Sequence, residues 1–129
     1  MSMRVLVVED SPAMRTFVRA ALEEGGLADV TEASNGFEAL RLLPREEFDL
    51  VVTDINMPDI HGLELISFMR KSNNHKTTPV IIVSTEGAQR DRDRGLALGA
   101  NAYLTKPFEP EELRAAAQRL WDERQSKED

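Results

Sequence analysis

The sequence predicts an α/β fold in which parallel strands are joined by crossover helices. Short apolar, β-branched runs alternate with longer segments of helical period, and this alternation occurs five times along the 129 residues. Three of the runs are continuously apolar, as expected for strands that helices cover on both faces. The length suits a single domain, 1–129, for which we expect an ordered core over about 3–124 and a charged C-terminal tail.

The strand candidates are short and bounded by turn signals. They are residues 4–8, 29–33, 50–53, 80–84 and 102–104. The first, third and fourth carry the continuous apolar runs, so we expect them at the centre of the sheet.

Local signals mark the ends of the first and last helices. Ser11 can cap the free amides of a helix that has Pro12 in its first turn, and Gly25 with Gly26 can end that helix. The last helix follows Pro110, and its first-turn glutamates suit the helix dipole. Both helices carry apolar residues at i, i+3, i+4, i+7 and i+8 and should dock firmly, whereas the charged end of the chain should fray.

The segments between these two helices are less regular. Shorter apolar stripes at 37–43 and 63–70 predict two more helices, and the polar stretch 71–79 is expected to be flexible surface. A fourth helix is expected within 87–99. It has few apolar residues and an internal Gly95, which costs ~1 kcal/mol relative to alanine, so it should be the least securely fastened element.

Composition excludes several classes of protein. A formal net charge of -7 argues against direct nucleic-acid binding, because phosphates would be repelled. Cysteine is absent and only His61 and His75 are available, so a structural zinc site is not expected, and both histidines are interpreted as solvated loop residues. The apolar run at 5–8 is too short for a signal peptide or a membrane span, so we expect a cytoplasmic protein without membrane insertion.

Polar residues follow the predicted strands at their carboxyl ends. Glu9 and Asp10 follow the first strand, Asp54 follows the third, Ser84 ends the fourth, and the fifth leads to Lys106. Ligands bind beyond this edge in open parallel sheets, so three carboxylates would converge if the first and third strands are neighbours. Two unit charges at ~4 Å repel by ~4 kcal/mol at an effective dielectric of ~20, so such a cluster needs a proton, a lysine or a metal. Oxygen ligands without cysteine favour Mg²⁺.

The acidic turn also argues against nucleotide cofactors. A domain that holds FMN needs a neutral, hydroxyl- or glycine-rich loop after the first strand, whereas "VVEDSP" places two negative charges there. GxGxxG and GxxxxGK[ST] are both absent from the sequence. Metal-dependent phosphoryl chemistry is the interpretation that remains.

Four motifs together carry a resemblance to a known family. They are "VVEDSPAMR", "VVTDINMPDIHGLELI", "PVIIVSTEG" and "GANAYLTKPF", in this order and spacing. Over nearly its whole length the chain resembles response-regulator receiver domains, in particular the single-domain regulators of the chemotaxis CheY type. The resemblance implies a flavodoxin-like, doubly wound sheet of order 2-1-3-4-5 with five helices, and a phosphoprotein of two-component signalling rather than an enzyme on external substrates.

The resemblance also implies a role for each acidic residue. Asp54 would accept a phosphoryl group from the phosphohistidine of a sensor kinase, forming an acyl phosphate. Asp10 and Asp54, with the backbone carbonyl of Asn56, would coordinate Mg²⁺. Glu9 stands where the family more often has aspartate and would act through a bound water.

Three further positions correspond to family residues that bind or sense the phosphoryl group. Lys106 would neutralise a phosphoryl oxygen, and its bond to Pro107 is usually cis in the family. Ser84 stands where the family has threonine or serine, and Tyr103 stands at the aromatic switch position. The face formed by the fourth helix, fifth strand and fifth helix would then carry the output.

The implied partners are a sensor histidine kinase or phosphotransfer protein and a downstream effector protein, in a chemotaxis or motility pathway or in a phosphorelay, with the chain a monomer or weak dimer. Two other functions stay open. One is a pseudo-receiver, a binding scaffold that is never phosphorylated. The other is a Mg²⁺-dependent phosphatase of the haloacid dehalogenase type, although the DxDx[TV] motif of that family requires a second acid at position 56, where Asn56 stands.

Overall fold

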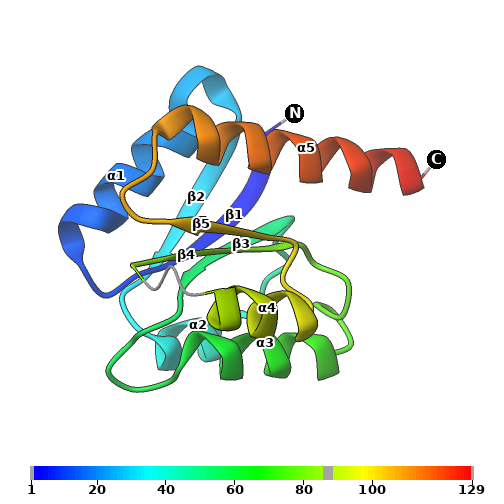
Figure 1. Cartoon of the computed structure of the whole chain (residues 1–129). Coiled ribbons are helices and arrows are strands. Elements are labelled where there is room, and N and C mark those ends of the chain that lie inside the picture. Colours follow the sequence, from blue (N-terminus) through cyan, green and yellow to red (C-terminus); the bar gives the residue numbers. More distant parts are fainter. Residues whose placement is uncertain (1, 86–88, 129) are drawn as a thin grey trace.

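The structure is a computed structural model that describes residues 2–85 and 89–128. Its centre is one parallel five-stranded sheet of order β2-β1-β3-β4-β5 (Figure 1). The strands are β1 (Met3–Val8), β2 (Ala28–Ala33), β3 (Leu50–Asp54), β4 (Val80–Ser84) and β5 (Ala102–Thr105). The predicted flavodoxin-like sheet and its strand order are confirmed, and β1, β3 and β4 occupy its three central positions.

Helices cover both faces of the sheet. They are α1 (Pro12–Glu23), α2 (Gly36–Leu42), α3 (Gly62–Lys71), α4 (Gln89–Ala97) and α5 (Pro110–Glu128), with a short 3₁₀ turn, η1 (Glu24–Gly26), after α1. Helices α1 and α5 lie on one face, and α2, α3 and α4 lie on the other (Figure 1). Each face has its own apolar core, so every central strand is buried on both sides. No helix in the described part of the chain is long and apolar enough to cross a membrane.

The first helix begins as its sequence predicts. The Ser11 hydroxyl accepts a hydrogen bond from the Met14 amide, and Pro12 occupies the first turn. At the other end, Gly25 and Gly26 both have positive φ, which glycine adopts without a side-chain clash. Helix α1 therefore has a fixed start directly after the acidic turn that follows β1.

Helix α4 packs more closely on the sheet than its polar sequence indicates. A Cβ at Gly95 would lie 2.6 Å from Ile82 Cδ1, so the glycine allows the helix backbone to approach β4. Gly95 therefore lowers the helix propensity of α4 but allows this helix to pack closely on β4. The helix is described from Gln89 onward, and the expected start at 87–88 lies outside the described residues.

The expectation that His75 is a solvated loop residue is wrong. The side chain is fully buried, with Nε2 2.7 Å from the carbonyl oxygen of Leu43 and 3.0 Å from that of Glu46. Nδ1 lies 3.1 Å from the Thr78 hydroxyl, and the ring stacks on Phe48. Carbonyl oxygens only accept hydrogen bonds, so Nε2 carries the hydrogen and satisfies backbone groups near the end of α2. His61 instead caps α3, its Nδ1 accepting from the Leu63 amide.

The charged C-terminal segment, expected to fray at its end, is helical as far as Glu128. Arg124 Nη1 donates to the Asp49 carbonyl oxygen at 3.3 Å, and this contact ties the later part of α5 to the rest of the fold. Asp49 directly precedes β3, so this contact lies at the edge of the sheet opposite to the edge that carries the acidic residues.

Candidate metal and phosphoryl site

The strand order brings the acidic residues together. Strand β1 lies between β2 and β3, and Val8 is paired with Thr53 in the parallel register. The residues that follow, Glu9 and Asp10 on one strand and Asp54 on the other, therefore leave the sheet at the same edge. Their carboxylates each offer an oxygen within 4.8 Å of the other two. The convergence that strand-end reasoning predicts is present.

Asp54 is held at the edge of the core by its own loop. Its carboxyl Oδ1 accepts hydrogen bonds from the amides of Ile55 at 2.7 Å and Asn56 at 3.3 Å. Its Oδ2 lies 3.1 Å from Lys106 Nζ. The side chain keeps only 11% of its surface exposed, so one carboxylate oxygen is fixed by backbone donors while the group stays accessible from one side.

Glu9 and Lys106 form the tightest ion pair of the cluster. Lys106 Nζ donates to Glu9 Oε1 at 2.6 Å, and the Ser11 amide donates to Glu9 Oε2 at 3.2 Å. Burial raises the pKa of Glu9 above its ordinary value, although the hydrogen bond from Lys106 opposes this. Burial alone would lower the pKa of Lys106, but hydrogen bonds to Glu9 and Asp54 outweigh it and raise that pKa. One ammonium group thus pairs with two of the three carboxyl groups of the cluster, which leaves an excess of negative charge.

The donor set fits a hard divalent cation. All three acidic side chains offer oxygen, the excess charge is negative, and one of the three, Asp10, is exposed to solvent where a partly hydrated ion can approach. Asp10, Asp54 and the Asn56 backbone carbonyl are the groups that would hold Mg²⁺ there.

Replacing Asp10 with asparagine is expected to stabilise the metal-free protein and to weaken Mg²⁺ binding by about tenfold or more. The substitution removes one charge from a cluster that one lysine does not neutralise, and it removes a ligand at the same time. Urea unfolding without metal and calorimetric titration with Mg²⁺ measure the two effects. Asp29→Asn, at an exposed site on β2, is the matched control and should change neither. A variant that binds Mg²⁺ as tightly as the wild type would exclude Asp10 as a ligand.

The residues that end the next two strands lie at the same edge. Ser84 is fully buried at the end of β4, one position beyond the Val83 that pairs with Asp54. The Lys106 amide donates to the Ser84 carbonyl oxygen at 2.7 Å, and the Lys106–Pro107 bond is cis. These backbone contacts place Lys106 over the carboxylates.

Tyr103 lies on β5, on the face of the sheet that α2, α3 and α4 cover (Figure 1). The residue is 4% exposed and belongs to the core on that face. The guanidinium of Arg92 on α4 lies 5.7 Å from the ring centroid, in cation–π geometry. The ring therefore links α4 to β5.

Sequence reasoning missed two residues that shape the loop after Asp54. Asp59 accepts hydrogen bonds from the amides of Gly36 and Phe37, which lie at the start of α2. Burial alone would raise the pKa of Asp59, but these backbone donors outweigh it and lower the pKa. At Gly62 a Cβ would lie 2.2 Å from the Asp54 carbonyl oxygen, so the start of α3 can approach the end of β3 this closely only with glycine. The "PD" turn and the glycine before the apolar stripe were the available signals.

The chain belongs to the response regulator receiver domain family, whose model matches residues 5–118. Receiver domains are signalling modules of two-component systems, not typical enzymes on external substrates. Among curated proteins, the chain is 40% identical over 113 residues to a chemotaxis protein CheY homolog of Campylobacter jejuni, which covers 87% of each chain.

The chain is also similar to solved structures of receiver domains and response regulators. The chemotaxis response regulator CheY4 of Vibrio cholerae matches with a TM-score of 0.86 and 35% identity, over 93% of this chain and 99% of that one. The receiver domain of the sensor histidine kinase PA1611 of Pseudomonas aeruginosa matches with a TM-score of 0.86 and 31% identity, over 95% and 99%. That structure has a magnesium ion coordinated in its active-site cleft.

Proposed function

We propose that this receiver domain accepts a phosphoryl group on Asp54 in the presence of Mg²⁺ and thereby switches its affinity for a downstream protein. The observation that carries the proposal is the convergence of Glu9, Asp10 and Asp54 around Lys106 at the carboxyl edge of the sheet. Like charges repel at this separation and destabilise the fold, so folding stability does not account for such a cluster. The magnesium-bound relative supports the choice of metal.

In the proposed reaction an Asp54 carboxylate oxygen attacks the phosphorus of a phosphohistidine. The oxygen–phosphorus bond forms as the nitrogen–phosphorus bond breaks, and the bonding pair stays on the imidazole. Mg²⁺, when bound, neutralises charge on the transferring phosphoryl group. Lys106 is near enough to Asp54 Oδ2 to meet a phosphoryl oxygen, and the Ile55 and Asn56 amides keep Oδ1 in place.

We further propose that Ser84 and Tyr103 convey the modification to the face of α4, β5 and α5. A doubly charged phosphoryl group would draw the buried Ser84 hydroxyl and Lys106 toward it through charge-assisted hydrogen bonds. A groove of about 490 Å³ lies on that face, lined by Leu96, Tyr103 and Ala116 with Arg92 and Arg119. Its apolar floor and basic residues support a role in binding an effector protein.

The proposed phosphodonor is a sensor histidine kinase or a phosphotransfer protein. The chemotaxis name of the Campylobacter relative favours a motility-type output over other pathways. A pseudo-receiver is the second candidate, since the same fold can bind partners without modification. The presence of the acids together with Lys106 and Ser84 argues against it. The phosphatase alternative lacks a general acid, because Asn56 occupies that position.

Intact-mass spectrometry after incubation with Mg²⁺ and a small phosphodonor tests the proposal. We expect a mass increase of one phosphoryl group that is stable in acid and labile in base, as an acyl phosphate is. EDTA should prevent the increase and Asp54→Asn should abolish it, whereas Asp49→Asn, at an acid before β3 on the opposite side of the sheet, should leave it intact. An unmodified wild type under these conditions would favour the pseudo-receiver.

A further inference from the structure

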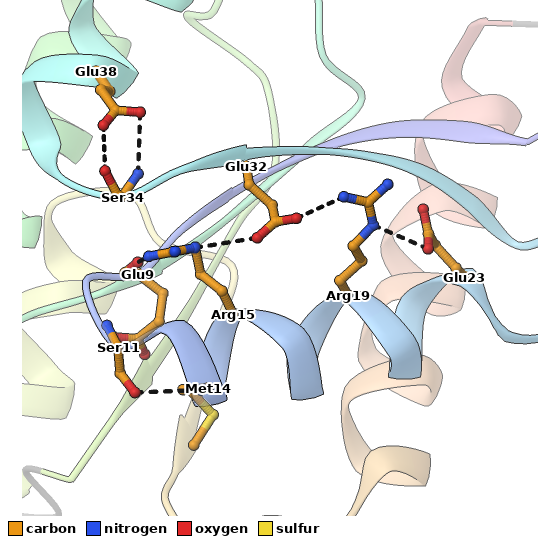
Figure 2. A network of polar contacts seen from close by, with 9 residues as sticks. All are labelled: Glu9, Ser11, Met14, Arg15, Arg19, Glu23, Glu32, Ser34 and Glu38. Carbon is orange, nitrogen blue, oxygen red and sulfur yellow. Dashed lines mark hydrogen bonds and ion pairs between the residues drawn. The ribbon is translucent and has the colours of Figure 1, made fainter.

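A chain of charged side chains runs along one side of α1 and ends on the backbone of the acidic turn (Figure 2). It begins at Glu23, which pairs with Arg19, and continues through Glu32 on β2 to Arg15. Arg15 Nη1 then donates to the backbone carbonyl oxygen of Glu9 at 2.9 Å. The last contact joins this surface network to the residues that would hold the metal.

Arg15 is oriented from two directions. Its Nε donates to Glu32 Oε1 at 3.1 Å while its Nη1 reaches the Glu9 carbonyl, so the planar guanidinium is fixed between β1 and β2. Only 19% of the Arg15 side chain is exposed, against 43% for Arg19. Hydrogen bonds from Arg19 and Arg15 lower the pKa of Glu32, which keeps the bridging carboxylate ionised.

The Glu9 carbonyl belongs to the peptide unit that leads into Asp10. A hydrogen bond that fixes this carbonyl also fixes the plane of the peptide and therefore the direction in which Asp10 leaves the backbone. No donor among residues 2–85 and 89–128 contacts the Asp10 carboxylate. The position of that carboxylate within 4.8 Å of the other acids therefore depends on the backbone of its turn.

We infer that Arg15 is a positioning residue for the metal site: by holding the Glu9–Asp10 peptide, it aims the Asp10 carboxylate at Asp54. The same turn is held by two hydrogen bonds to Glu9: the Ser11 amide donates to its carboxylate Oε2, and Arg15 donates to its backbone carbonyl. Glu32 acts indirectly on the same turn, because it accepts a hydrogen bond from Arg15 Nε and so fixes the orientation of the guanidinium. This role rests on the proposed function, since it concerns binding of the same Mg²⁺.

A purely structural role would predict something different. A surface ion pair that only joins α1 to β2 contributes little and acts on folding rather than on metal affinity. Arg19 is the internal comparison, because it shares Glu32 and lies one helical turn from Arg15, but its ion pairs are with Glu23 and Glu32 rather than with the acidic turn. If the network were only a tether, the two arginines would behave alike.

Calorimetric titration of the full chain with Mg²⁺ separates the two roles. Arg15→Met keeps the aliphatic part of the side chain and removes the donors, and we expect it to weaken Mg²⁺ binding by roughly 10- to 100-fold, as for residues that orient metal ligands. Arg15→Lys can restore one of the two contacts and should recover part of the affinity. Arg19→Met should stay within about twofold of wild type.

Each outcome decides a different point. If the wild type binds Mg²⁺ and Arg15→Met binds it equally well, the positioning role is wrong and the proposed function stands. If the wild type fails to bind Mg²⁺, the proposed function itself fails. Equal losses in Arg15→Met and Arg19→Met would indicate a tether and overturn the inference. Should Arg15→Met not fold, Arg15→Lys and Glu32→Gln decide the question, and both must lower the affinity in a protein whose urea midpoint is unchanged.

Discussion

Replacing Lys106 with methionine is expected to lower the free energy of unfolding of the metal-free protein by roughly 2 to 3 kcal/mol at neutral pH. The ammonium group lies 2.6 Å from Glu9 and 3.1 Å from Asp54, whose side chains are 2% and 11% exposed. Without it, two carboxylates remain at the edge of the core with no compensating charge. The expected loss is smaller than the roughly 3–5 kcal/mol for fully buried pairs because Asp54 keeps some contact with solvent.

The pH dependence of this loss follows from the two pKa shifts. The pKa of Glu9 is raised, so the folded state keeps its proton to higher pH, and ionisation of Glu9 removes stability as the pH rises. Lowering the pH should therefore reduce the difference in free energy of unfolding between Lys106→Met and the wild type. The pKa of Lys106 is also raised, so its contribution is complete below the ordinary lysine pKa and is lost only in strongly alkaline solution.

Urea unfolding followed by circular dichroism across pH measures these changes. Lys71→Met, the same substitution at an exposed lysine, is the control and should be close to neutral. Saturating Mg²⁺ should restore part of the stability of Lys106→Met, because binding to the folded state adds to its stability. Equal stability of this variant and the wild type in metal-free buffer at neutral pH would show that the lysine does not compensate the acids.

Replacing Gly62 with alanine is expected to cost at least ~3 kcal/mol in unfolding free energy, although alanine is the better helix former. The new Cβ would lie 2.2 Å from the Asp54 carbonyl oxygen and 2.8 Å from Ile55 Cα. Both atoms are backbone, so the clash cannot be relieved by a side-chain rotation. Either α3 or the loop after β3 must move, and Mg²⁺ affinity should fall with it.

Gly26→Ala provides a matched comparison for this clash. Gly26 has φ 76°, but nothing lies within 4 Å of the place that a Cβ would take, so alanine there meets only the cost of a left-handed backbone, ~1 kcal/mol. Thermal or urea unfolding of both variants separates steric from conformational cost. If Gly62→Ala proves as mild as Gly26→Ala, the start of α3 is not in close contact with the end of β3.

The sheet and the acidic cluster could be predicted because their signals are local. The continuous apolar runs marked β1, β3 and β4 as central, and carboxyl ends of neighbouring parallel strands meet at one edge of a sheet. Given that order, Glu9, Asp10 and Asp54 had to lie together. Their individual roles in metal binding and phosphoryl transfer stay predictions.

Other features depend on contacts between distant residues and left no local signal. His75 sits in a polar stretch, and the carbonyl oxygens that it satisfies belong to Leu43 and Glu46, 32 and 29 residues earlier. Arg15 lies on the polar side of an amphipathic helix, where an arginine is ordinary, and its guanidinium is directed to the Glu9 carbonyl by Glu32, 17 residues later on β2. Gly95 was interpreted as a weakness of α4, whereas its contact with Ile82 becomes visible only when helix and strand are packed.

The most direct test of the central claim is a crystal structure of the protein with Mg²⁺ and beryllium fluoride, a mimic of the phosphoryl group. We expect the metal on the carboxylates of Asp10 and Asp54 and the carbonyl oxygen of Asn56, with the fluoride group on Asp54 in contact with Ser84 and Lys106. A magnesium ion bound elsewhere, or a beryllium adduct on another acid, would contradict the assignment.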